Sequence, residues 1–411
     1  MPENEAAIEF VSFRDYHYKE EVIKYCALIV KRNASHPELI PLFEENQLDS
    51  LITNSVDTMY SYRADWDFEG FRYGERLYNL IWKPLEKSLA GVNTIYYSPA
   101  GKLNQIAFAA IPIDTAKTLM DKYELRQVTS TKEILKKRTP DNEIKSAVLF
   151  GGIKYEIKDS LELKSALSLA NPDIATRSGG IEQGNSGGFK ELPGSKREVE
   201  GIRTVLNDKG ISIRIYDSIQ ANEKNFKELS GKRKDIIHIA THGFYIPKTD
   251  ADREGLKYLF FGRENKSVVV ENPLLRSGLA LAGANKAWRG DTVPDNCENG
   301  LLTSYEISQM NLFGTKLVVL SACGTGLGDI NGSQGVYGLQ RAFKIAGVET
   351  IIMSLWKVPD EATSKLMQLF YKFWITDQSD IHTAFHQAQN EIRKMKEYSN
   401  IKSWAGFVII D

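Results

Sequence analysis

Apolar residues along this chain fall into short β-type runs separated by longer amphipathic stretches. Short runs rich in β-branched residues are typical of buried strands, and apolar positions spaced three and four apart are typical of helices. Strands that alternate with helices predict an α/β fold with a mainly parallel sheet. The predicted strands are 94–98, 106–111, 125–129, 147–151, 212–216, 235–242, 278–282, 316–323, 350–356 and 404–410. The predicted helices are 48–62, 68–89, 195–206, 222–229, 336–346, 360–374 and 381–398.

Two segments depart from this alternation. Residues 6–11 and 22–30 are apolar runs joined by a polar turn at 14–19, which predicts an antiparallel hairpin at the edge of the sheet. Residues 175–194 are rich in glycine and poor in large apolar side chains, which predicts a surface loop. Such a loop is either a tolerated insertion or a cleavable activation or gating loop.

Charge and composition exclude several classes of protein. Lys and Arg total 52 against 53 Asp and Glu, so no basic excess indicates nucleic-acid binding. We find no apolar run near the roughly 20 residues of a membrane-spanning helix, and the first residues do not resemble a signal peptide. The three cysteines, Cys26, Cys297 and Cys323, are few and far apart, which favours a reducing, cytoplasmic setting over a disulfide framework.

Two predicted strands end at a reactive side chain followed by glycine. One ends at His242-Gly243 and the other at Cys323-Gly324. Ligands of open parallel sheets collect at the carboxyl ends of the strands. A cysteine and a histidine that meet at this edge would supply a nucleophile and its base for attack on a carbonyl. The backbone N–H groups of Gly243 and Cys323 would stabilise the oxyanion that results.

Other chemistries fit these residues less well. The glycines at 324, 326 and 328 lack the spacing of a dinucleotide-binding loop and lead into Asp329. The pairs His238/His242 and His382/His386 offer too few ligands for zinc, and the second pair lacks the glutamate of a zinc-protease helix. We therefore expect neither a cofactor nor a metal.

Several motifs, in order along the chain, resemble those of one family. They are Tyr96–Gly101, Ile106–Ala110, Ile237–Gly243, Asn272–Asn285, Gly300–Ile307, Val318–Gly326, Gly335–Leu339, Ser354–Thr363 and Trp404–Phe407. Together they resemble the CHAT family of caspase-like cysteine peptidases, which are related to separases and often follow tetratricopeptide repeats.

The resemblance implies a three-layer caspase-like fold with helices on both faces of the sheet. It implies a degenerate caspase-like subdomain over residues 1–140 and a catalytic domain over residues 141–411. His242 would be the general base and Cys323 the nucleophile. The substrate pocket would be bordered by Ser354, Trp356 and Asp360, and either Asp360 or Asp329 would supply an acid for a basic substrate side chain.

Three functional hypotheses follow. The first is a cysteine endopeptidase that cleaves a protein substrate and is activated by a partner, such as a tetratricopeptide-repeat protein, in bacterial defence or cell death. The second is a catalytically silent scaffold that binds a peptide in the cleft. The third is an acyl transferase that uses the same covalent intermediate.

Overall fold

The computed structural model of the chain contains two compact units. The first comprises Met1–Asn142, Ile330–Gly335 and Phe385–Asp411, and the second comprises Glu143–Asp329 and Val336–Ala384. The structure describes residues 2–16, 22–32, 34–52, 74–135, 143–158, 160–167, 188–246, 272–291, 293, 297–323, 329–330 and 336–411. Most of the glycine-rich segment 175–194 lies outside these residues. The expected domain division at residue 140 stays a prediction, and the C-terminal residues from Phe385 group with the first unit.

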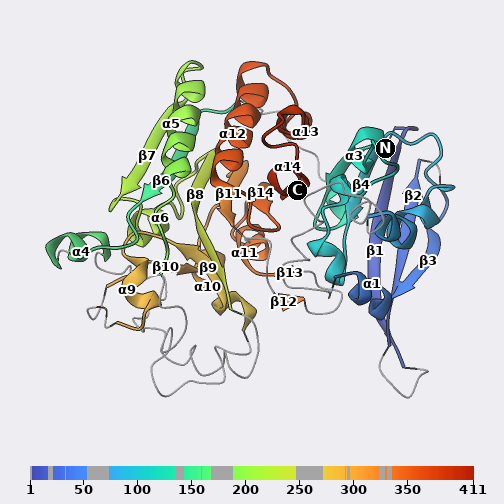
Figure 1. Ribbon diagram of the computed structural model, residues 1–411, viewed down its shortest axis with the longest axis horizontal. Helices are drawn as coiled ribbons and strands as arrows, with labels where there is room; N and C mark the ends of the chain where they lie inside the picture. The colour runs from blue at the N-terminus through green and yellow to red at the C-terminus, as the bar shows by residue number, and fades with distance from the viewer. Residues whose placement is uncertain are drawn as a thin grey trace. The chain divides into compact units, whose positions relative to one another are not determined.

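The first unit is built on a mixed sheet with strand order β15-β5-β4-β1-β2-β3. Figure 1 labels four of these strands, β1 to β4. The pairs β1/β2 and β2/β3 are antiparallel, and the other pairs are parallel. The predicted N-terminal hairpin is therefore confirmed, and β3 extends it. The strands are β1 (Glu5–Asp15), β2 (Val22–Lys31), β3 (Glu38–Glu44), β4 (Thr94–Ser98), β5 (Glu124–Gln127) and β15 (Phe407–Ile410).

Short helices pack on this sheet. The core between the sheet and these helices contains Phe108, whose ring contacts the rings of Phe10, Trp82 and Tyr97. The helices are α1 (Glu45–Ile52), η1 (Tyr78–Trp82), η2 (Lys83–Leu85), η3 (Gly101–Gln105), η4 (Phe108–Ala110), α3 (Leu119–Lys122), η5 (Thr131–Leu135), α13 (Ile381–Lys394, in this unit from Phe385) and α14 (Ile401–Trp404).

One strand prediction in this unit was wrong. Residues 106–111 form the turn η4 and its flanks rather than a strand. Ile106, Ala107, Phe108, Ala110 and Ile111 are all buried. A short apolar run that is buried on every side carries no period that separates a strand from a turn.

The second unit is built on a mainly parallel sheet. The strands β7, β6, β8, β11 and β14 lie side by side in this order and run parallel. On one side of β8, Ile236–Ile239 pair with β6, and His242–Tyr245 pair with the antiparallel β9. The strands of this sheet are β6 (Ser146–Ile153), β7 (Ser212–Ser218), β8 (Ile236–Tyr245), β9 (Ser277–Ala280), β10 (Leu301–Thr303), β11 (Leu317–Cys323) and β14 (Thr350–Ser354). The short strands β12 (Asp329–Ile330) and β13 (Val336–Tyr337) form a separate two-stranded sheet.

Helices cover both faces of this sheet. On one face His238 of β8 contacts Glu198 of α5 and Tyr371 of α12, and the two helices lie side by side (Figure 1). On the other face Phe150 of β6 contacts Phe226 of α6, which contacts α11. The helices are α4 (Ser160–Leu167), α5 (Pro193–Asn207), α6 (Glu223–Lys227), η7 (Pro273–Leu275), α9 (Ala284–Trp288), α10 (Ser304–Ser308), α11 (Leu339–Ile345), α12 (Asp360–Tyr371) and η9 (Lys372–Thr376).

This arrangement confirms the predicted α/β class, with a mainly parallel sheet between two helical layers. The helix predicted to begin at residue 336 begins instead at Leu339, because Val336 and Tyr337 form β13. Within the part of the chain that the structure describes, no helix combines the length and apolar character needed to cross a membrane.

Candidate active site

The strands β8 and β11 bring the backbone positions of His242 and Cys323 together. The two strands run parallel and in register from the pair Ile236–Leu317 to the pair His242–Cys323. Neighbouring strands of a sheet lie about 4.7–4.9 Å apart. The two residues are therefore backbone neighbours at the carboxyl edge of the sheet. The side chain of Cys323 is outside the described part of the chain.

The N-termini of two helices lie at the same edge. Side chains alternate along a strand, so His238 and His242 of β8 point to the face that α5 and α12 cover. The helices begin next to each other, because the Gly194 N–H at the start of α5 donates to Asp360 Oδ2 at the start of α12, over 2.5 Å. Helix N-termini carry partial positive charge, which favours an anion such as a thiolate nearby.

A backbone carbonyl orients the imidazole of His242. Its Nε2 lies 2.7 Å from the carbonyl oxygen of Lys190. A carbonyl only accepts hydrogen bonds, so the imidazole must carry a proton on Nε2. In the neutral ring this leaves Nδ1 with a free lone pair, which is the state that a general base needs.

The surroundings of His242 favour the neutral ring. Burial lowers the pKa of His242 below its usual value of 6.5, and the charge of Lys357 lowers it further. The Lys190 hydrogen bond and the charge of Asp360 act in the opposite direction without cancelling the effect of burial. The rings of Tyr155 and Phe189 contribute to this burial, since they lie 5.1 and 5.5 Å from the imidazole.

The other residues predicted for this site lie on several elements. Gly243 pairs with Leu279 of β9, directly after His242. Ser354, at the end of β14, donates its hydroxyl proton to the carbonyl of Ala322 over 2.6 Å, one residue before Cys323. Ser354 and Trp356 are both 1 % exposed. Their predicted contact with substrate stays a prediction, as does the oxyanion role of Gly243.

The two candidate acids differ in position. Asp360 accepts the Gly194 N–H and acts on His242 electrostatically, so it belongs to this edge of the sheet. Asp329 lies in the short strand β12, and its side chain is outside the described part of the chain. A role for either acid in binding a basic substrate side chain stays a prediction.

A buried polar network beneath the site was missed from the sequence. His238 Nε2 lies 2.8 Å from Glu198 Oε1, and Tyr371 Oη lies 3.3 Å from His238 Nδ1. All three side chains are buried. The sequence alone does not reveal this network, because the partners of His238 lie 40 and 133 residues away along the chain.

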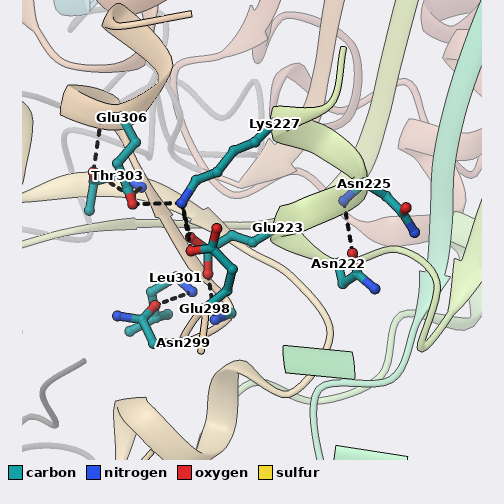
Figure 2. A network of polar contacts seen from close by, with 10 residues as sticks. Asn222, Glu223, Asn225, Lys227, Glu298, Asn299, Leu301, Thr303 and Glu306 are labelled. Carbon is teal, nitrogen blue, oxygen red and sulfur yellow. Dashed lines mark hydrogen bonds and ion pairs between the residues drawn. The ribbon is translucent and has the colours of Figure 1, made fainter. Parts of the chain in front are cut away.

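A second buried network surrounds Lys227 (Figure 2). Its ammonium group lies 2.9, 2.7 and 2.9 Å from carboxylate oxygens of Glu223, Glu298 and Glu306. Burial, together with the neighbouring charge of Glu223, raises the pKa of Glu298 to about 8. The three carboxylates are close enough together to bind a metal ion, but the ammonium group of Lys227 already lies among them as a cation.

Residues 72–411 match the family model described as the CHAT domain. Two curated relatives, tetratricopeptide repeat protein 28 of Mus musculus and of Homo sapiens, are 30% and 31% identical over 110 residues. The aligned stretch is 27% of this chain and only 4% of the length of either relative.

Two solved structures are similar to the chain. The pro- and mature domains of RgpB from Porphyromonas gingivalis give a TM-score of 0.43 at 10% identity, over 84% of this chain and 68% of the other. The separase–securin complex of Saccharomyces cerevisiae gives a TM-score of 0.49 at 9% identity, over 99% of this chain and 30% of the other. Similarity at this level says nothing about the activity of this chain.

Proposed function

The chain belongs to the CHAT domain family, and on this basis we propose that it is a cysteine endopeptidase with Cys323 as nucleophile and His242 as general base. The observation that carries the proposal is the register of β8 and β11, which makes these two residues Cα partners at the carboxyl edge of the sheet. The tautomer and lowered pKa of His242 suit a base that is neutral near pH 7.

The proposed reaction proceeds in two steps. Nδ1 of His242 takes the thiol proton of Cys323 as the sulfur attacks the peptide carbonyl carbon, and the backbone N–H groups of Gly243 and Cys323 bind the oxyanion. The imidazolium then protonates the departing amine, which leaves a thioester on Cys323. Water, deprotonated by His242, attacks the thioester and releases the acid and the free thiol.

The substrate is an extended peptide that lies along this edge of the sheet. The strand β14 pairs with β11, and Ser354, Trp356 and Asp360 lie between the end of β14 and the start of α12. We propose that these three residues border the pocket for the substrate residue before the cut bond. An acid there, Asp360 or Asp329, would favour a lysine or arginine side chain.

We place this activity in a regulated pathway of bacterial defence or cell death, in the cytoplasm. The partner proposed for activation is a protein with tetratricopeptide repeats. The matched relatives carry such repeats in their names, which is what favours this class of partner.

Thiol labelling tests the dyad without the need for an activator. We expect a chloro- or iodoacetamide reagent to modify Cys323 at least tenfold faster than Cys26 and Cys297, because Cys323 is the strand partner of His242, the proposed base. His242→Ala should remove that preference. Cys26→Ala is the matched control and should leave it unchanged. Equal, slow labelling of all three thiols would refute the dyad and leave the peptide-binding scaffold.

A positional-scanning peptide library then tests the reaction. Cleavage that stops in Cys323→Ala and His242→Ala, with both variants folded as the wild type, supports the endopeptidase. A transfer product in place of two peptide fragments would instead indicate an acyl transferase. Preference for lysine or arginine, lost in Asp360→Ala, would locate the acid of the pocket.

A further inference from the structure

The side chain of Asn285 holds the backbone of Phe189 from both sides. Its Oδ1 accepts the Phe189 N–H over 2.6 Å, and its Nδ2 donates to the Phe189 carbonyl over 3.0 Å. Lys190, the next residue, places its carbonyl on Nε2 of His242. The hydrogen bond that sets the tautomer of His242 therefore depends on a peptide unit that Asn285 holds.

Asn285 is itself fixed in place. It is 3 % exposed and lies in the first turn of α9. Its backbone N–H donates to the Tyr155 carbonyl over 3.3 Å, and Nδ2 also donates to Glu156 Oε2 over 3.2 Å. Glu156 is held in turn by two hydrogen bonds from Arg289, of 2.5 and 2.9 Å. Nδ2 of Asn285 therefore donates to the Phe189 carbonyl and to the Glu156 carboxylate, while Oδ1 accepts the Phe189 N–H. These partners fix which end of the amide carries the nitrogen.

The glycine before Phe189 fits closely against the same amide. Gly188 has φ +55°, in the left-handed region, and a Cβ atom added there would lie 2.7 Å from Asn285 Oδ1. A side chain at this position would be strained and would push against the amide. The close contact between Gly188 and Asn285 therefore restricts which side chains fit at either position.

We propose that Asn285 is a positioning residue for His242: it holds residues 188–190 so that the Lys190 carbonyl keeps the proton of the imidazole on Nε2. The catalytic consequence rests on the proposed function, because a base with its lone pair on Nδ1 matters only if His242 acts on Cys323. Phe189 takes part through its ring, which lies 5.5 Å from the imidazole and 4.8 Å from Trp288 of α9.

Long-range ¹H–¹⁵N spectra of the imidazoles test the positioning directly, with the signal of His242 identified by its loss in His242→Ala. In the wild type at pH 7.5 we expect the Nε2–H tautomer. In Asn285→Asp a carboxylate faces the Phe189 carbonyl and Glu156, so the contact is lost and the signal should shift toward a mixture of both tautomers. Gly188→Ala should give the same shift from the opposite side of the contact. The double variant should shift no further than either single variant.

Gln389→Leu is the matched control. Gln389 is another buried amide, and its Nε2 donates to the carbonyls of Trp404 and Phe407 in the first unit. We expect no change in the His242 tautomer in this variant. An equal change there, or an unchanged tautomer in both Asn285→Asp and Gly188→Ala, would overturn the proposal.

Catalysis gives a second, separate readout. Loss of a partner that orients a histidine costs about 10- to 100-fold at metal sites, and we expect a fall of similar size in kcat for Asn285→Asp, with a smaller change in KM. A tautomer shift in a protein whose Cys323 shows no fast, His242-dependent labelling would refute the proposed dyad and still support the positioning role. A normal tautomer with normal kcat in Asn285→Asp would refute the positioning role alone.

Discussion

At the scale of single residues, the tautomer and the pKa of His242 depend on the groups that surround its ring. Two aromatic rings lie against it, and one backbone carbonyl fixes the position of the proton. Lys357 and Asp360 act on the same ring with opposite signs. The base strength of this histidine is therefore set by five neighbours from other parts of the chain.

This balance predicts the titration of His242. Its pKa lies below 6.5, so the midpoint measured by NMR should also lie below 6.5. Lys357→Met removes a positive charge and should raise the midpoint, whereas Asp360→Asn should lower it. The folded protein binds this proton more weakly than the unfolded chain, so His242 lowers the free energy of unfolding as pH falls from 6.5 toward the folded pKa. A wild-type midpoint above 6.5 would contradict the proposed effect of burial.

The rate of Cys323 alkylation should depend on the protonation state of His242. A protonated imidazole cannot take the thiol proton, so the rate should fall as pH drops through the pKa of His242. In Lys357→Met this fall should begin at a higher pH. A profile identical in both proteins would show that a different group controls the thiol.

At the scale of elements, a polar network joins three of them. Glu198 of α5 and Tyr371 of α12 both bond to His238 of β8. The helices that begin beside His242 are thereby tied to the strand that carries it. An unsatisfied polar group in a buried position costs about 1–3 kcal/mol.

This network predicts the effect of substitutions at Glu198. Glu198→Ala leaves His238 Nε2 without a partner and should lower the free energy of unfolding by about 1–3 kcal/mol. Glu198→Gln retains a side-chain oxygen and nitrogen at the same place, and its cost should be under about 1 kcal/mol. Tyr371→Phe removes only the longer contact, of 3.3 Å, and should cost less than Glu198→Ala. Urea unfolding measures all three, and an equal loss in the Ala and Gln variants would argue against the hydrogen bond.

At the scale of the whole molecule, each unit contains its own set of paired strands, and the chain returns to the first unit at its C-terminus. β15 pairs with β5, so the sheet of the first unit needs residues from both ends of the chain. The family match over residues 72–411 runs through both units. The first 142 residues alone would therefore lack a strand of their own sheet.

The cluster around Lys227 predicts how stability depends on pH. Glu298 has a folded pKa of about 8, above its ordinary value of 4.5, so the folded state holds this proton more tightly than the unfolded chain does. Its contribution to stability is complete below about pH 4.5 and is lost as pH rises through about 8, with a slope of at most about 1.4 kcal/mol per pH unit. Glu298→Gln cannot ionise and should flatten this part of the profile. Urea unfolding between pH 5 and 9 measures it, and an unchanged slope in the variant would assign the dependence to other groups.

Much of the fold could be predicted from the sequence. The β-branched runs that became β6, β8, β11 and β14 are long enough and apolar enough to be recognised one at a time. Residues 106–111 could not be assigned correctly, because burial on all sides removes the periodic signal. The candidate residues His242 and Cys323 were visible because each is the last residue of a predicted strand and precedes a glycine.

The sequence by itself placed a reactive side chain near the carboxyl end of each of two strands, because local hydrophobic patterns report on local structure. Only β11 ends at that residue, since β8 continues past His242 to Tyr245. Only the tertiary structure decided that the two strands are neighbours in register, and which groups control the imidazole. The Lys190 carbonyl is a backbone atom that every residue carries, and Asn285 holds it from 96 residues away along the chain. Contacts of this kind have no signature in a single sequence, because they depend on how distant segments pack.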